Sequence, residues 1–102
     1  MKYSVEGDRN LRVVVLESNL EGGWDTFRLK DEITSRLTDG DRRFLIDMNS
    51  SKFVSSTGIG VLVALQSSIR GAEGELKLCG VNERTRRSFF ATGINVWQNF
   101  DI

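Results

Sequence analysis

Apolar residues alternate with polar ones over residues 3–6 and 75–79, form nearly continuous runs over 11–16 and 44–48, and recur every three to four positions between these segments. Glycine, aspartate or asparagine borders each of the four segments. Such runs are typical of buried or half-buried β-strands. The first two are separated by the turn-forming residues 7–10, which predicts an opening hairpin.

Helices are predicted in the intervals that follow the second, third and fourth strands. The first helix is expected to begin at a cap formed by Asp25 or Thr26. The second is expected over about residues 58–70, and the third is expected to begin after a cap at Asn82. The buried stripe of the first helix is expected to consist of Leu29, Ile33 and Leu37.

The elements follow the order β-β-α-β-α-β-α, which predicts an α/β fold with a partly parallel, mixed sheet. An apolar tail is expected to add a last short strand at most. No proline, repeat or low-complexity segment divides the chain, so residues 1–102 are expected to form a single domain. The apolar residues of the tail are Ile94, Val96, Trp97 and Phe100.

The composition excludes several classes of function. The 102 residues carry 14 acidic and 14 basic side chains, so net charge gives no reason to expect a nucleic-acid partner. The absence of histidine removes histidine-based catalysis and most zinc sites, and we expect no catalytic residue, metal or cofactor. Cys79 is the only cysteine, which excludes an internal disulfide, and we expect it to be a buried strand residue. No apolar run approaches the ~20 residues of a membrane span and no signal-peptide core is present, so we expect a cytoplasmic protein without membrane insertion.

Three consecutive hydroxyl side chains, Ser55, Ser56 and Thr57, stand where the third strand and its loop give way to the second helix. A helix start carries free backbone N–H groups and the positive end of the helix dipole, and it accommodates a phosphate well. The position of these hydroxyls favours a regulatory serine over a catalytic pocket.

The chain resembles the STAS family, the fold of bacterial anti-sigma factor antagonists, over nearly its whole length. The resemblance is densest in residues 45–48, Leu-Ile-Asp-Met, and in residues 53–62, Phe-Val-Ser-Ser-Thr-Gly-Ile-Gly-Val-Leu. Residues 80–82 and 92–94 are similar to the family's last strand-to-helix turn and to its helix stop. The resemblance implies helices packed mainly on one face of the sheet, with a C-terminal helix that is short or absent in this chain.

The resemblance also implies a function. In phosphorylated members the acceptor is the first hydroxyl of the Ser-[Ser/Thr]-Gly triplet, which is Ser56 here, with Thr57 as a secondary candidate. The implied protein is a non-enzymatic antagonist that binds an anti-sigma factor, a serine kinase of the histidine-kinase-like ATPase type, while unphosphorylated. Phosphorylation of Ser56 would end the complex and a PP2C-type phosphatase would restore it. The oligomeric state stays open.

The same residues have structural interpretations. Ser56 would make a good N-cap for the second helix, Thr57 fits the first helical position, and Ser55 fits a loop hydroxyl. Asp47 either satisfies loop N–H groups or orients Ser56. The glycines of the Gly58-Ile59-Gly60 sequence favour close packing of the helix start on the sheet, because the lysine of a P-loop is missing.

Apolar residues occur on both sides of the second helix. By steps of about 100° per residue, Val61, Ala64 and Leu65 fall opposite the face that carries Ile59 and Leu62. Residues on that second side are either buried inside the domain or contact a partner. The expected partner-binding residues are Asp47, Ser55, Ser56, Thr57, Gly58, Val61, Ala64 and Leu65.

Two features lie outside the motif. Trp24 falls off the apolar stripe of the first helix and is expected at the edge of the core. Arg84, Arg86 and Arg87 are expected to form a solvated face, with contact to an acidic partner as the alternative.

Two rival functions remain open. The first is an accessory subunit of a membrane transporter or a larger signalling scaffold, in which the second helix docks permanently and Ser56 is only structural. The second is a nucleotide-binding module, against which the missing P-loop lysine and the missing histidine argue.

Overall fold

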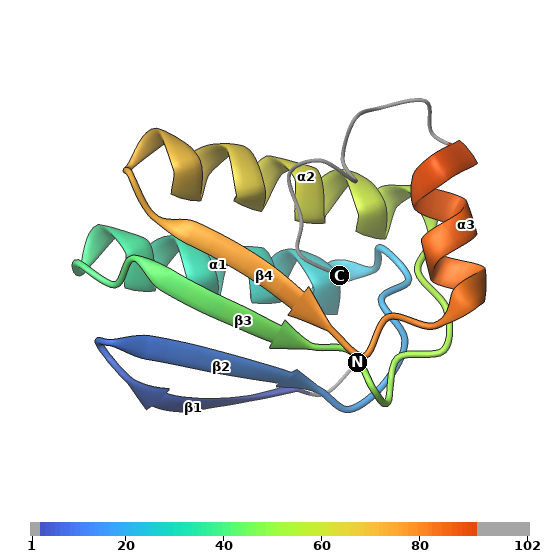
Figure 1. Cartoon of the computed structure of the whole chain (residues 1–102), viewed down its shortest axis with the longest axis horizontal. Helices are drawn as coiled ribbons and strands as arrows, with labels where there is room; N and C mark the ends of the chain where they lie inside the picture. The colour runs from blue at the N-terminus through green and yellow to red at the C-terminus, as the bar shows by residue number, and fades with distance from the viewer. Residues whose placement is uncertain (1–2, 92–102) are drawn as a thin grey trace.

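The described part of the chain begins with an antiparallel hairpin, drawn in blue in Figure 1. The structure, a computed structural model, describes residues 3–91. Strands β1 (Tyr3–Asp8) and β2 (Leu11–Leu16) pair along their full length, from Tyr3 opposite Leu16 to Asp8 opposite Leu11. The predicted hairpin is confirmed, although β1 extends two residues further into the predicted turn.

Strands β3 (Arg43–Asp47) and β4 (Glu75–Cys79) continue the sheet in parallel with β2, in the order β1-β2-β3-β4. Helix α1 (Trp24–Thr38) connects β2 to β3, and helix α2 (Ser56–Gly71) connects β3 to β4. Parallel neighbours require such crossover helices. The predicted mixed α/β fold is therefore confirmed.

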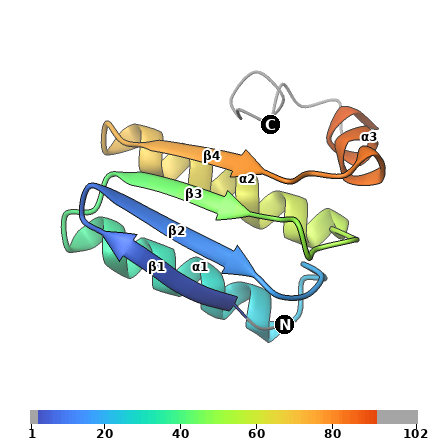
Figure 2. The same ribbon diagram turned by 60° about the horizontal axis from the view of Figure 1, so that its bottom comes forward.

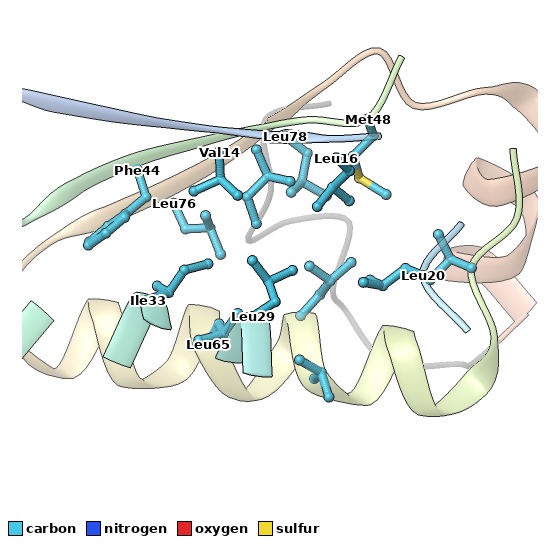
Figure 3. Packing of buried hydrophobic residues seen from close by; sticks show 14 of the residues in the cluster. Val14, Leu16, Leu20, Leu29, Ile33, Phe44, Met48, Leu65, Leu76 and Leu78 are labelled. Atoms are coloured by element: carbon cyan, nitrogen blue, oxygen red, sulfur yellow. The ribbon is translucent and has the colours of Figure 1, made fainter. Parts of the chain in front are cut away.

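Helices α1 and α2 lie on one face of the sheet, as Figure 2 shows. Side chains alternate between the two faces of each strand, and every second one enters the layer between sheet and helices. Figure 3 shows this core, with the strands on one side and α1 and α2 on the other. The buried strand residues are Val14, Leu16, Phe44, Ile46, Leu76 and Leu78.

Helix α1 buries the predicted stripe, because Leu29 and Ile33 are inaccessible to solvent and Leu37 packs against the core. Its predicted caps are wrong. The N-cap is Gly23, without a side-chain hydrogen bond, and the helix already begins at Trp24. The hydroxyl of Thr26 instead accepts a hydrogen bond from the backbone N–H of Gly22 at 3.0 Å.

Helix α3 (Glu83–Ala91) lies beyond the carboxyl ends of β3 and β4 (Figure 1). The predicted cap at Asn82 is confirmed, since its Oδ1 accepts from the backbone N–H of Thr85 at 2.8 Å. The helix stop near Thr92, the apolar tail, its last short strand and the C-terminal helix lie outside the described residues.

Candidate functional site

The hydroxyl cluster lies at the N-terminus of α2, where a short bridge fixes the chain just before the helix. Leu20 pairs with Val54 as an isolated parallel bridge. The backbone N–H of Leu20 donates to the carbonyl of Phe53 at 3.0 Å, and that of Ser55 donates to the carbonyl of Leu20 at 2.9 Å. The start of α2 is therefore held against the segment that leads from β2 into α1.

Ser55, and not Ser56, caps α2. Ser55 has an extended backbone conformation, with φ −73° and ψ 169°, and its Oγ accepts from the backbone N–H of Gly58 at 3.0 Å. This is the geometry of an N-cap hydroxyl bonded to the third residue of its helix. The interpretations of Ser56 as the cap and of Ser55 as a loop hydroxyl are wrong, because the Leu20 bridge places Ser55 at the turn into the helix.

Ser56 is the first residue of α2, and its side chain is exposed. Its hydroxyl makes no hydrogen bond with any group in residues 3–91. Thr57 occupies the second helical position, one later than predicted, and its Cβ lies 2.6 Å from the place where a Cβ on Gly22 would stand. Thr57 thus lies against Gly22 through its carbon atoms and, like Ser56, is exposed.

The two glycines of the motif differ in their surroundings. A Cβ on Gly58 would stand 2.7 Å from the carbonyl oxygen of Leu20 and 3.1 Å from a methyl group of Val54. Close packing therefore explains Gly58, although its neighbour is the bridge segment and not the sheet. The same explanation is wrong for Gly60, where an added Cβ would meet nothing within 4 Å.

Asp47 organises the loop after β3. Its Oδ1 accepts from the backbone N–H of Asn49 at 3.0 Å and from the Asn49 side-chain amide at 2.7 Å. The prediction that Asp47 satisfies loop N–H groups is confirmed. No hydrogen bond joins Asp47 to Ser56 in the described structure, so nothing in the geometry assigns it the alternative role of orienting the serine.

Helix α2 packs on two neighbours, α1 and β4. Its second apolar side is therefore buried inside the domain. Val61 is 4% exposed and Leu65 is 1% exposed, and Figure 3 shows Leu65 directed into the core. Both are core residues, so their assignment to a partner-binding surface is wrong. Ala64 is half-buried and stays available at the surface.

The side of α2 that faces away from the core is narrow and carries small side chains. Ser56, Gly60 and Ser67 are exposed, and Val63 and Ala64 are half-buried. We call these five residues the outer face of α2. It replaces the predicted Val61 and Leu65 as the part of the helix that another protein can contact.

Two exposed aromatic side chains at the start of α1 were not anticipated. Trp24 is 69% exposed, well outside the core edge at which it was expected, and Phe27 is also exposed. The guanidinium of Arg28 lies over the Trp24 ring, 5.1 Å from its centre. Phe27 could have been found from the sequence, because it also falls off the stripe that contains Leu29 and Ile33.

Within residues 3–91 no group of three or more Asp, Glu or Cys side chains is placed to hold a metal ion. A hollow lined by Leu11, Arg43, Leu45 and Lys77 includes the first residue of β3, so it belongs to the opposite end of the parallel strands from the start of α2. The chemistry available at α2 is that of an exposed alcohol at a helix terminus.

Burial raises the pKa of the Cys79 thiol, the negative charge of Asp47 raises it further, and a backbone hydrogen bond involving Met48 opposes both effects. Cys79 is half-buried, in place of the full burial expected. A raised pKa disfavours the reactive thiolate, which makes a catalytic role for this cysteine unfavourable.

None of the helices in residues 3–91 has the length and the apolar run that crossing a membrane requires.

The chain is similar to proteins named for anti-sigma factor antagonism. BtrV of Bordetella bronchiseptica, named as a candidate anti-sigma factor antagonist, is 29% identical over 83 residues, which are 81% of this chain and 66% of BtrV. This chain thus spans just under two thirds of that relative's length.

Solved structures share the fold at low sequence identity. The crystal structure of TM1081 from Thermotoga maritima, also named as a candidate anti-sigma factor antagonist, matches with a TM-score of 0.84 and 17% identity over 98% of this chain and 86% of TM1081. The Bacillus cell fate determinant SpoIIAA in its phosphorylated form matches with a TM-score of 0.77 and 17% identity over 98% of this chain and 89% of SpoIIAA. A sequence model of the STAS domain matches residues 25–101, and the chain therefore belongs to the STAS-domain family.

Proposed function

We propose that this protein is an anti-sigma factor antagonist whose binding to an anti-sigma factor is controlled by phosphorylation of Ser56. One observation carries the proposal: Ser55 caps α2, whereas Ser56, the first residue of the helix, is exposed and leaves the cap untouched. A phosphate added to Ser56 leaves the hydrogen bond from Gly58 to Ser55 intact. Relatives named anti-sigma factor antagonists support the class of partner.

The proposed switch follows from electrostatics. Phosphorylation adds about −1.5 to −2 charges at neutral pH, and these interact favourably with the helix dipole at the first residue of α2. The first turn of α2 carries no acidic side chain that would repel them. The same charge disfavours an interface formed over Ser56 because the phosphate would have to be desolvated. The domain stays folded while the complex dissociates.

The proposed interface consists of Ser56, Thr57 and the outer face of α2. Gly60 and Ala64 present little side-chain volume there, so a partner can approach the helix backbone closely. The partner is proposed to be a serine kinase that acts on Ser56, and a PP2C-type phosphatase reverses the reaction. The protein itself needs no enzymatic activity and would act in the cytoplasm.

The test compares binding by Ser56→Ala and Ser56→Asp, both used as baits in lysate of the native cell. We expect an anti-sigma factor with an ATPase-type kinase fold on the alanine bait and its loss from the aspartate bait. Ser68→Asp is the matched control, because it places the same charge on an exposed position further along α2. Purified partner and ATP should then phosphorylate the wild type and leave Ser56→Ala unmodified, as read by mass spectrometry.

Equal recovery of the same proteins on both baits would contradict the proposal. Transporter subunits in that set would identify the accessory-subunit function instead. Calorimetry with ATP and GTP tests the nucleotide-binding alternative, which requires heat of binding from the isolated protein.

A further inference from the structure

The backbone of Lys52 and Phe53, in the loop that leads to α2, is bonded at every polar group. Oδ1 of Asn19 accepts from the N–H of Lys52 at 2.9 Å and from the N–H of Phe53 at 3.2 Å. Nδ2 of Asn82 donates to the carbonyl of Lys52 at 3.1 Å, and the N–H of Leu20 donates to the carbonyl of Phe53 at 3.0 Å. Two asparagines from distant parts of the chain therefore hold this dipeptide in one conformation.

The side chains of the same dipeptide point outward. Lys52 is exposed and Phe53 is 37% exposed, one of the few large apolar side chains at the surface of the described residues. The guanidinium of Arg84, from the first turn of α3, lies over the Phe53 ring at 5.3 Å from its centre. Neither of these two side chains is buried in the core, whereas the next residue, Val54, is a core residue.

The two elements that contribute Phe53 and Arg84 are basic, whereas the segment that contains Asn19 carries the exposed Glu17 and Glu21. Between them, the loop of residues 48–55 and α3 contain four basic side chains and one acidic side chain, although the whole chain has a net charge of zero. The acidic one, Glu83, already pairs with Arg87 at 3.5 Å. Local positive charge next to a partly exposed aromatic ring is complementary to carboxylates that lie beside an apolar side chain.

We propose that Lys52, Phe53 and Arg84 form a docking surface, organised before binding, for an acidic segment of the anti-sigma factor. The ring would contact an apolar side chain of that segment, while Lys52 and Arg84 pair with its Asp or Glu side chains. This proposal rests on the proposed function for the identity of the partner. It adds a second contact region next to the proposed interface on α2.

The docking surface also lies within reach of the proposed phosphate. Ser56 lies three positions after Phe53 in the chain, which limits their Cα atoms to about 11 Å apart. That distance is close to the Debye length of about 8 Å at physiological ionic strength. A phosphate on Ser56 thus lowers the positive potential of the docking surface in addition to obstructing the interface on α2.

The first experiment uses a defined probe, so that it does not depend on Ser56. A glutamate-rich decapeptide with a central leucine is titrated into the isotopically labelled protein and followed by NMR. We expect chemical-shift changes in residues 49–53 and 82–87, and a fall in affinity with added salt. Arg84→Glu should weaken peptide binding by about tenfold, whereas Lys77→Glu, the same charge change at an exposed position of β4, should change the affinity by less than about twofold.

Two further variants separate charge from geometry. Arg84→Lys keeps the charge but loses the planar guanidinium over the ring, and we expect an intermediate loss of affinity. Asn19→Ala removes two of the four hydrogen bonds that hold the Lys52–Phe53 backbone, without removing any contacting group. We expect about threefold to tenfold weaker binding with an unchanged NMR fingerprint elsewhere. An Asn19→Ala protein that binds the peptide as the wild type does would overturn the role of the rigid loop.

The remaining outcomes are equally decisive. Equal losses from Arg84→Glu and Lys77→Glu would mean that only net charge matters, and the docking surface would be rejected. Tighter binding of a single-stranded RNA of matched charge would also reject it, in favour of nucleic acid.

Once an anti-sigma factor is identified, Arg84→Glu should weaken that complex in the Ser56→Ala background. If the Ser56 variants behave alike while the peptide results hold, the proposed switch fails and the acidic-ligand surface stands.

Discussion

Arg12 and Asp41 form an ion pair that joins the opening hairpin to the segment before β3. Nε of Arg12 donates to Oδ2 of Asp41 at 2.7 Å, and the Asp41 side chain is only 3% exposed. Nη1 of Arg12 also donates to the carbonyl of Gly7 at 2.9 Å, in the same hairpin. Arg9 adds a longer contact to the other carboxylate oxygen, at 3.6 Å.

Asp41→Ala is expected to lower the free energy of unfolding by about 3 kcal/mol, because the Arg12 guanidinium loses its partner in a largely buried position. Urea denaturation measures this. The control is Glu32→Ala, which breaks the more exposed pair with Arg36 inside α1 and should cost less than about 1 kcal/mol. Equal losses in the two variants would mean that burial does not strengthen the Arg12–Asp41 pair.

The same mutation should have a larger effect on stability at Ser55 than at Ser56. Ser55→Ala removes the hydroxyl that caps Gly58 and should cost about 1 kcal/mol of stability. Ser56→Ala removes an exposed hydroxyl and should change stability by less than about 0.5 kcal/mol. Thermal or chemical denaturation of the two variants, side by side, checks the assignment. A larger loss of stability for Ser56→Ala than for Ser55→Ala would identify Ser56 as the N-cap instead.

The identity of the residue that caps α2 could not be predicted from the sequence. All four strands, the three helices and the position of the hydroxyl cluster followed from periodicity and turn residues. Three adjacent hydroxyls, however, are all competent to cap a helix, and local sequence does not choose among them. The choice is made by the bridge between Leu20 and Val54, a contact between residues 34 positions apart in the sequence.

The burial of the second apolar side of α2 also could not be predicted from the sequence. The helical period placed Val61 and Leu65 on a side of their own and left burial and partner contact as alternatives. A helix that packs on both a sheet and a neighbouring helix needs a wider apolar surface than one stripe. Period alone does not distinguish that arrangement from an exposed interface. The exposure of Trp24 was not predicted for a related reason. An aromatic residue outside the apolar stripe of a helix can lie either at the edge of the core or in solvent.

Gly60→Ala should make the protein more stable. Gly60 lies inside α2, is exposed, and has open space where a Cβ would stand. Alanine favours the helix over glycine by about 1 kcal/mol at such a position, so the unfolding midpoint should rise. Because Gly60 belongs to the proposed interface, the same variant should bind the anti-sigma factor more weakly. A more stable protein with unchanged binding would remove Gly60 from the interface.

Glu73 is the only non-glycine residue with a positive φ in the described chain, at 65°. It follows α2, where its N–H donates to the carbonyl of Arg70 at 2.9 Å. Glycine adopts this conformation without a Cβ clash, so Glu73→Gly should raise the free energy of unfolding by about 0.5–1 kcal/mol. Glu73→Ala keeps the Cβ and should leave stability nearly unchanged. A loss of stability with glycine would show that the Glu73 side chain contributes contacts of its own.

Cys79 gives a pH dependence with a defined sign. Because its pKa is raised in the folded protein above the ordinary value of 9.0, its contribution to stability is complete below pH 9.0 and is lost as the pH rises through the folded-state pKa. Wild type should therefore lose more stability than Cys79→Ser in this alkaline window. Melting temperatures of both proteins across the window check this, and parallel curves would contradict it. Asp47→Asn removes one cause of the shift, so alkylation of Cys79 by iodoacetamide should become faster.

The placement of Ser56 inside the first turn of α2 constrains any enzyme that would modify it. A kinase that recognises a linear motif binds its substrate as an extended peptide. Ser56 cannot adopt that conformation while the Leu20 bridge and the Ser55 cap hold the first turn of α2 in place. Modification would thus require an active site shaped to receive a folded helix end. A synthetic peptide of residues 50–60 should accordingly be a poor substitute for the whole domain, and resistance to unrelated cellular kinases would come from architecture, without any need for a distinctive sequence around the serine.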